Sequence, residues 1–182
     1  MPNDICDRLL VLASSRQKVS EAGKIPAIQR YDGVLWRVLR VAIDRGAQTN
    51  VVFLSPRYGL READFEIEGY SEELTADVAM RMKERQRSRR APLADERFHS
   101  DALAELLTMR GGRRQPFDDI ALCGGVLYVD VMRSFVEYLQ EQRSQEHRVI
   151  DPRARITTID DARGNMRLEL ARWLGVENIL FG

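Results

Sequence analysis

Four short apolar runs are the most regular feature of this chain, and each run ends in small, polar or cationic residues. The runs lie at 8–13, 50–55, 118–123 and 155–159. Apolar runs of this length without alternation are typical of strands buried on both faces of a parallel sheet. The pattern therefore predicts four parallel strands whose carboxyl ends share one edge, where open α/β sheets bind their ligands.

Helical patterns alternate with these runs. We expect helices at about 27–45, 73–89, 99–110, 126–143 and 163–174. Phe65-Glu66-Ile67 adds a short edge strand. Strands that alternate with helices are typical of a doubly wound α/β sandwich, so we expect a mainly parallel sheet of four to five strands.

The chain of 182 residues has the length of one domain, and it shows no internal repeat and no linker. Residues 1–182 are therefore interpreted as a single α/β domain. The basic stretch 81–115 is the least regular part, and we interpret it as a lid or a helical excursion from the sheet.

Composition excludes several classes of protein. The formal net charge is zero, so only a local patch could attract nucleic acid or a membrane. Apolar runs are too short to span a membrane, and the N-terminus lacks the apolar centre of a signal peptide, so a cytoplasmic location is expected. Two cysteines and two histidines lie far apart, which predicts free thiols, no metal site and no cofactor.

The loop after the first run is a candidate anion site. It carries Ser14, Ser15 and Lys18, and such a loop can bind an anion through backbone N–H groups, hydroxyls and charge together. It lacks the glycine pattern of a Walker loop. The alternative is that the two serines simply end the strand.

The loop after the second run is more specific. Pro56 restricts one backbone angle, and Gly59 permits a conformation that other residues avoid. The resulting rigid loop would direct Arg57 and Tyr58 toward the crevice, with Ser55 beside them. The alternative is a turn with an aromatic plug.

Further candidates lie at the starts of two helices. Tyr31 and Gly33 stand where a helix is interrupted or begins, and they either line the pocket or serve the structure alone. Gly124 and Gly125 permit the close approach of a ligand or of another backbone, and Tyr128 follows one helical turn later.

Two charged segments remain open to two interpretations. The run 81–90 contains the clustered arginines that contact with phosphates needs, but it also fits a solvated helix end. Asp160-Asp161 precede a helix whose N-terminus favours anions, but two aspartates would repel an anion and fit a helix cap instead.

Taken in order, these segments resemble a known superfamily. The motifs are Ala13-Ser14-Ser15-x-x-Lys18, Arg30-Tyr31-Asp32-Gly33-x-Leu35-Trp36, Leu54-Ser55-x-x-Tyr58-Gly59-Leu60, Tyr70 and Gly124-Gly125-x-x-Tyr128. They are similar to those of the YaaA-like superfamily of bacterial and phage domains, which includes the peroxide-stress protein YaaA and a domain of archaeosine synthase. The resemblance covers about two thirds of the chain, and the Leu-Ser-x-x-Tyr-Gly-Leu segment is its most specific part.

The resemblance implies a Rossmann-like three-layer sandwich with a pocket at the strand ends and a link to nucleic acid. It also adds Tyr70 to the candidate ligand-binding residues. One departure is that Ser14 stands where the family usually has a cysteine, so chemistry that needs a thiolate there is in doubt, whereas anion binding and a role for Lys18 are not.

Three functional hypotheses follow. The first is a nucleotide-, nucleobase- or nucleic-acid-binding protein, with or without activity as a nucleobase-modifying transferase or hydrolase; Arg57 and Lys18 would hold a phosphate, and a tyrosine would stack on the base. The second is a non-catalytic DNA-binding stress-response protein that uses residues 81–90. The third is a small-ligand or partner-binding module. No catalytic residue, substrate or oligomeric state follows from the sequence.

Overall fold

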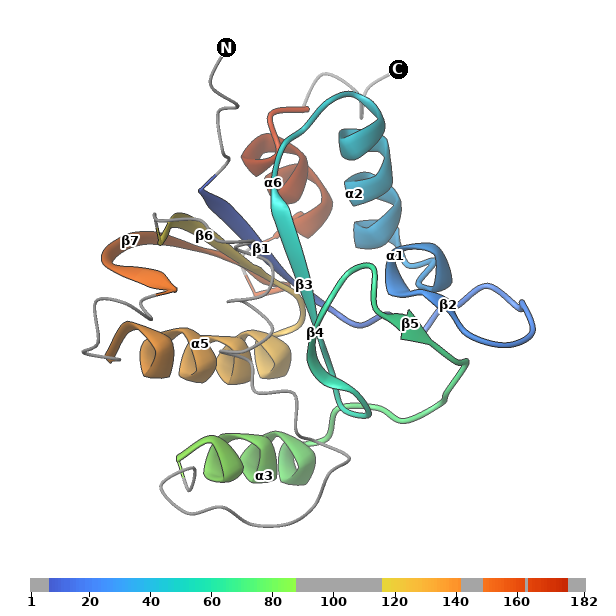
Figure 1. Cartoon of the computed structure of the whole chain (residues 1–182), viewed down its shortest axis with the longest axis horizontal. Helices are drawn as coiled ribbons and strands as arrows, with labels where there is room; N and C mark the ends of the chain where they lie inside the picture. Colours follow the sequence, from blue (N-terminus) through green and yellow to red (C-terminus); the bar gives the residue numbers. More distant parts are fainter. Residues whose placement is uncertain (1–6, 88–115, 142–148, 163, 177–182) are drawn as a thin grey trace.

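The computed structural model describes residues 7–87, 116–141, 149–162 and 164–176. It is a mixed α/β structure built on a five-stranded sheet in the order β4-β3-β1-β6-β7 (Figure 1). The strands are β1 (Arg8–Ala13), β3 (Asn50–Ser55), β4 (Gly59–Glu62), β6 (Phe117–Cys123) and β7 (Ile150–Ile159).

The four predicted strands are confirmed, and they are parallel. β1 lies between β3 and β6, and β6 pairs with β7 on its other side. Leu10 of β1 faces Val51 on one side and Ala121 on the other. All four carboxyl ends therefore lie along one edge of the sheet, and this edge carries the candidate site.

Helices cover both faces of the sheet because the strands are apolar on both sides. Leu9 and Val11 belong to a core formed with α3 (Ala76–Arg87) and α5 (Val126–Glu141). The alternate residues Leu10 and Leu12 belong to a second core formed with α1 (Ala27–Arg30), α2 (Val34–Asp44) and α6 (Met166–Trp173). Figure 1 shows α2 and α6 on one side of the sheet and α5 and α3 on the other.

The helix expected at 27–45 is divided into α1 and α2, and the division falls at Tyr31 to Gly33, where an interruption or a helix start was expected. Tyr31 ends α1 in an extended conformation, and Gly33 precedes α2 in an extended conformation as well. Asp32 does not cap α2 with its side chain; it forms ion pairs with Arg37 and Arg40 instead. The break therefore places Tyr31 and Gly33 at the carboxyl edge of the sheet.

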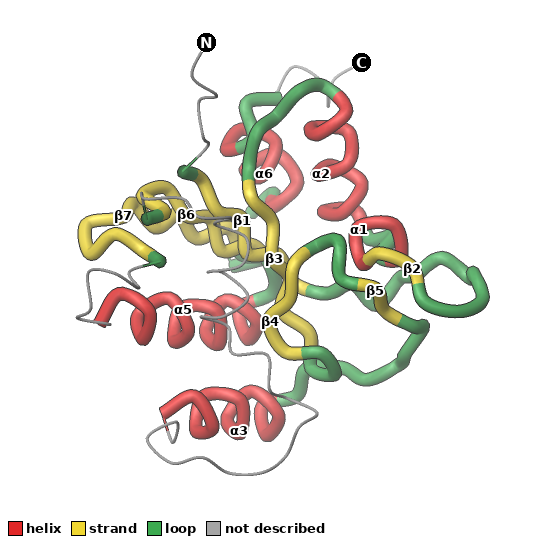
Figure 2. The backbone as a smooth tube through the Cα atoms, in the orientation of Figure 1, coloured by secondary structure: helices red, strands yellow, loops and turns green. Residues whose placement is uncertain are grey.

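Two short strands differ from expectation in whether they form or in the partner they take. Residues 59–62, expected as loop, form β4, which pairs antiparallel with β3 and makes the edge of the sheet. The short strand expected at 65–67 is β5 (Glu66–Ile67), and it pairs with β2 (Ile25–Pro26) in a separate two-stranded sheet. Figure 2 shows this small sheet beside α1.

Three elements also begin at other residues than expected. β7 begins at Ile150, five residues earlier than expected, because Ile150 pairs with Phe117. α3 and α6 begin three residues later than expected, where the side chains of Thr75 and Asn165 accept hydrogen bonds from backbone N–H groups of the first turn.

The helix expected at 99–110 and most of the stretch 81–115 lie outside the described residues. In the part of the chain that the structure describes, no helix has the length and apolar character needed to cross a membrane.

Candidate functional site

The carboxyl edge of the sheet brings together segments that are far apart in the sequence. The N–H of Ser14 donates to the carbonyl of Leu54 at 2.9 Å, and the N–H of Gly124 donates to the carbonyl of Ile159 at 3.0 Å. The loops after β1 and β6 therefore begin beside the carboxyl ends of the neighbouring strands β3 and β7.

Tyr70 is the centre of the site. It lies in the coil segment 68–75 between β5 and α3, and its ring is half-buried. Its hydroxyl is 2.6 Å from the hydroxyl of Tyr31 and 2.9 Å from that of Ser55. Tyr70 is thus held against the ends of β3 and α1 by two hydrogen bonds.

Two predicted cations meet at this ring. The Lys18 Nζ atom lies 4.0 Å from the centroid of the Tyr70 ring, and the Arg57 Cζ atom lies 6.0 Å from it. A cation within about 6 Å of an aromatic ring is attracted by the ring's quadrupole. Burial lowers the pKa of the Lys18 ammonium, and the nearby Glu72 carboxylate acts in the opposite direction.

Lys18 reaches Tyr70 because its loop pairs with the end of α1. The N–H of Asp32 donates to the carbonyl of Gln17, and Lys18 and Tyr31 form an isolated antiparallel bridge. Gly33 permits this approach, since a β-carbon at that position would overlap the hydroxyl of Ser15.

Ser55 shapes the turn that presents Arg57 and Tyr58. Its hydroxyl accepts hydrogen bonds from the N–H groups of Arg57 at 3.1 Å and Tyr58 at 3.2 Å. Ser55 then pairs with Gly59, whose φ of 69° belongs to the left-handed region that favours glycine. The segment is therefore the turn of the β3–β4 hairpin, and Arg57 is exposed on it.

Tyr31 and Ser55 are the buried residues on which Tyr70 rests. Both are 0% exposed. The Tyr31 ring packs 4.8 Å from the Trp36 ring and 5.4 Å from the Phe53 ring, between centroids. A ring enclosed in this way cannot stack on a base, whereas Tyr58 and Tyr70 are partly exposed.

The hydroxyl of Ser14 is 2.9 Å from the hydroxyl of Tyr128 on the first turns of α5. Burial raises the pKa of the Tyr128 phenol, which keeps it protonated near neutral pH. A neutral phenol is a poor general base, so Ser14 has a hydrogen-bonding partner in Tyr128 but no activating base there.

Gly124 and Gly125 form the tight connection from β6 to α5. A β-carbon at Gly124 would lie 2.5 Å from that of Ala13, whereas one at Gly125 would meet only the Asp161 carboxylate at 4.0 Å. The Asp161 carboxylate accepts a hydrogen bond from the N–H of Val126 at 3.2 Å, so it caps α5. Gly124 is thus required for packing between strands.

The predicted site residues thus fall into two groups. Those around the Tyr70 ring come from the β1 loop, the β3–β4 turn, the end of α1 and segment 68–75: Lys18, Tyr31, Ser55, Arg57, Tyr58, Gly59 and Tyr70. The others shape the neighbouring edge near α2 and α5: Ser14, Ser15, Gly33, Gly124, Gly125 and Tyr128.

Sequence reasoning missed Arg30, which is 1% exposed. Its guanidinium donates to the carbonyls of Val19, Glu21 and Gly23, so it holds the loop that follows Lys18. An arginine inside a helical pattern gives no local signal of burial.

Sequence reasoning also missed the acidic pair Glu72-Glu73. Arg57 donates to the Glu72 carboxylate at 3.0 Å, and Arg16 lies 3.3 Å from the Glu73 carboxylate. The helix expected at 73–89 includes Glu73, but α3 begins only at Ala76, so both carboxylates lie in the coil segment.

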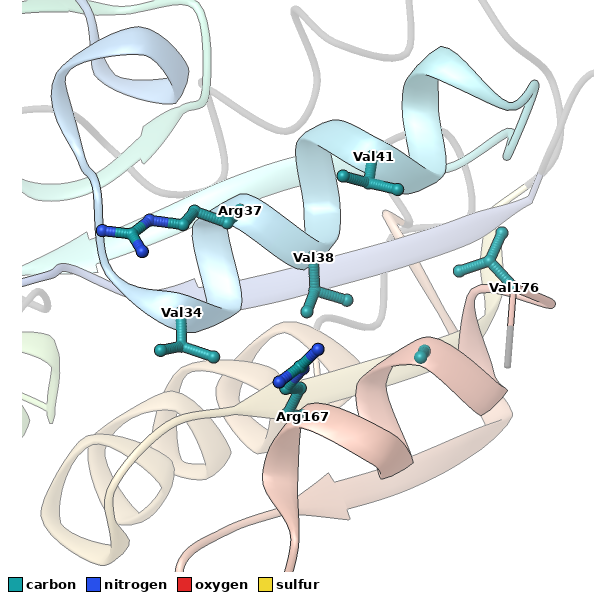
Figure 3. Close-up of a pocket in the computed structure, with 7 residues that line it drawn as sticks. Val34, Arg37, Val38, Val41, Arg167 and Val176 are labelled. Carbon is teal, nitrogen blue, oxygen red and sulfur yellow. The ribbon is translucent and has the colours of Figure 1, made fainter. Parts of the chain in front are cut away.

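A separate apolar groove of about 310 Å³ lies between α2 and α6. Its lining consists mainly of valines, with an arginine from each helix: Val34, Arg37, Val38, Val41, Arg167, Ala171 and Val176. Figure 3 shows these side chains along the two helices. None of the predicted site residues lines this groove.

Metal-ligating groups do not gather in the described residues, where no three of the His, Cys, Asp and Glu side chains could hold an ion together. Cys123 is a buried free thiol at the end of β6, and burial raises its pKa. Cys6 lies outside the described residues.

Comparison with protein-family models, with curated proteins and with solved structures gives no match for this chain.

Proposed function

We propose that this protein binds a nucleotide, or the nucleotide at an end of a nucleic acid, at the carboxyl ends of its parallel strands. The observation that carries the proposal is the meeting of Lys18 and Arg57 at the ring of Tyr70. A partly exposed aromatic ring beside two cations offers a nucleotide both of the interactions it needs, namely stacking for the base and charge for the phosphate.

The proposal gives a role to each group. Tyr58 and Tyr70, whose ring centroids are 5.4 Å apart, provide aromatic surface for the base. Lys18 and Arg57 bind the phosphate, and the hydroxyls of Ser14 and Tyr128 provide hydrogen bonds at the neighbouring edge. Tyr31 and Ser55 hold Tyr70 in place through its hydroxyl.

The proposal includes the fold family. Helices on both faces of a mainly parallel sheet support a Rossmann-like three-layer sandwich, and the positions of Tyr31, Ser55 and Tyr70 in one hydrogen-bonded cluster support membership of the YaaA-like superfamily. We further propose that Ser14 binds ligand and does not act as a nucleophile, since its partner Tyr128 is protonated.

The test is isothermal titration of the purified protein with nucleosides, nucleoside mono-, di- and triphosphates, and short single-stranded oligonucleotides. We expect binding of at least one nucleotide, and we expect Arg57→Ala to weaken it at least tenfold, about 1.4 kcal/mol. The matched control is Arg153→Ala, because Arg153 is an exposed arginine of β7 outside the site. Equal losses in the two variants would contradict the proposal.

The same titration distinguishes the DNA-binding alternative. That hypothesis places binding on the run 81–90, of which the structure describes residues 81–87. There Lys83 pairs with Asp130 of α5, and Gln86 donates to the carbonyl of Ser134. Loss of oligonucleotide binding in Arg81→Ala, with Arg57→Ala unaffected, would favour the alternative.

A further inference from the structure

Two carboxylates of the protein form ion pairs with cations on the loops of the candidate site. Arg57 from the β3–β4 turn pairs with Glu72, and Arg16 from the β1 loop pairs with Glu73. Both carboxylates belong to adjacent residues of the coil segment 68–75, which also carries Tyr70. One short segment thus brings two negative charges to cations on two different loops.

These ion pairs are exposed. The side chains of Arg57 and Glu72 are 41% and 51% exposed, and those of Arg16 and Glu73 are 89% and 62% exposed. Exposed pairs contribute little to stability because water and salt screen them. The pairs are therefore easily exchanged for a stronger anion, and the fold does not depend on them.

The backbone around the pair allows this exchange. Segment 68–75 has neither helix nor strand, and the hydroxyl of Tyr70 ties it to the sheet through Ser55 and Tyr31. The hydrogen bonds of Tyr70 involve neither carboxylate. Glu72 and Glu73 can thus leave the cations while the aromatic ring stays in place.

We infer that Glu72 and Glu73 occupy the position of the ligand's anionic group, and that the site takes a ligand with a di- or triphosphate, which replaces Glu72 at Arg57 and Glu73 at Arg16. This inference rests on the proposed function and specifies its ligand class. Each carboxylate pairs with a different arginine, and two linked phosphates offer one anionic group to each arginine, whereas a single phosphate offers one group in all. The acidic pair therefore favours ligands with two or more phosphates over ligands with one.

The experiment compares Glu72→Gln/Glu73→Gln with the native protein, using inorganic pyrophosphate, inorganic phosphate and nucleosides as separate probes. The matched control is Glu66→Gln/Glu68→Gln, which changes the charge equally on two exposed residues just upstream. We expect the first double variant to bind pyrophosphate about threefold to tenfold more tightly than native protein, as loss of two exposed pairs implies. We expect the control to bind as native protein does.

The outcomes separate this inference from the proposed function. Nucleoside binding with pyrophosphate affinity unchanged in the Glu72→Gln/Glu73→Gln variant would overturn the inference and leave the proposed function intact. Tighter pyrophosphate binding without any nucleoside or nucleotide binding would support the anionic subsite and overturn the proposed function. If pyrophosphate affinity rose equally in both double variants, net charge alone would explain the effect and the inference would be overturned. Absence of binding to every probe would overturn both the inference and the proposed function.

Discussion

The Nζ atom of Lys18 lies 4.0 Å from the centroid of the Tyr70 ring, although the two residues belong to segments on opposite sides of β3 in the sequence. The contact joins the loop after β1 to the coil before α3. Two sets of contacts hold the residues in place. One is the pairing of Lys18 with Tyr31, and the other is the pair of hydrogen bonds that the Tyr70 hydroxyl makes.

Tyr70→Phe should destabilise the protein. The change removes the hydroxyl that bonds Ser55 and Tyr31, both of which are fully buried. A buried polar group that loses its partner costs about 1–3 kcal/mol in the free energy of unfolding. Urea denaturation measures the loss. Tyr58→Phe is the control, since its hydroxyl accepts from the exposed N–H of Glu68 and from no other group among the described residues, and an equal loss there would contradict the prediction.

Gly124→Ala and Gly125→Ala should behave differently although the residues are neighbours. The new β-carbon at 124 would lie 2.5 Å from the Ala13 β-carbon of β1, whereas at 125 the nearest atom is 4.0 Å away. Overpacking typically costs about 1–3 kcal/mol. We expect a thermal unfolding midpoint clearly lowered for Gly124→Ala and nearly native for Gly125→Ala. Similar midpoints would show that β6 and α5 shift freely.

Arg30→Lys should loosen the loop after Lys18 although the charge is kept. The buried guanidinium donates to three carbonyls, and an ammonium cannot reproduce that planar fork. We expect a loss of about 1–3 kcal/mol per carbonyl left without a partner. Limited proteolysis should show faster cleavage within 19–24. Arg37→Lys, which alters an exposed ion pair, should cost under about 1 kcal/mol and leave the cleavage rate unchanged.

Stability should fall above about pH 10 because of Tyr31. Burial raises the pKa of its phenol far above the ordinary value of 10.0, so the folded state keeps the proton. The unfolded state releases it above that value and gains about 1.4 kcal/mol per pH unit. This stability is complete below pH 10 and is lost as the pH rises. Tyr31→Phe should flatten the loss, measured as the free energy of unfolding at about pH 9 and about pH 11.

The control for the alkaline experiment is Tyr138→Phe, because Tyr138 lies on α5 and packs against the core on the opposite face of the sheet from Tyr31. It should keep the native slope between the two pH values. A native slope in Tyr31→Phe as well would show that Tyr31 does not contribute to the alkaline loss.

The four parallel strands were predictable because burial on both faces of a sheet requires a continuous apolar run, and this signal is local. The smaller strands were predictable only in part. The sequence indicates β5, but it does not show that β5 pairs with the two-residue strand β2, and β4 is a strand only because β3 lies beside it. α3 begins later than the expected residue 73 because the hydroxyl of Thr75 caps it by accepting a hydrogen bond from the N–H of Val78.

The sequence by itself determined which loops follow the parallel strands at their carboxyl ends. The apolar runs and the glycines and prolines after them are patterns within a few residues. Tertiary structure alone decided how those segments meet. It buried Tyr31 and Ser55 beneath Tyr70, and it set Glu72 against Arg57. The physical reason is that distances between side chains depend on strand order and on the path of each loop, and residues distant in the sequence determine both.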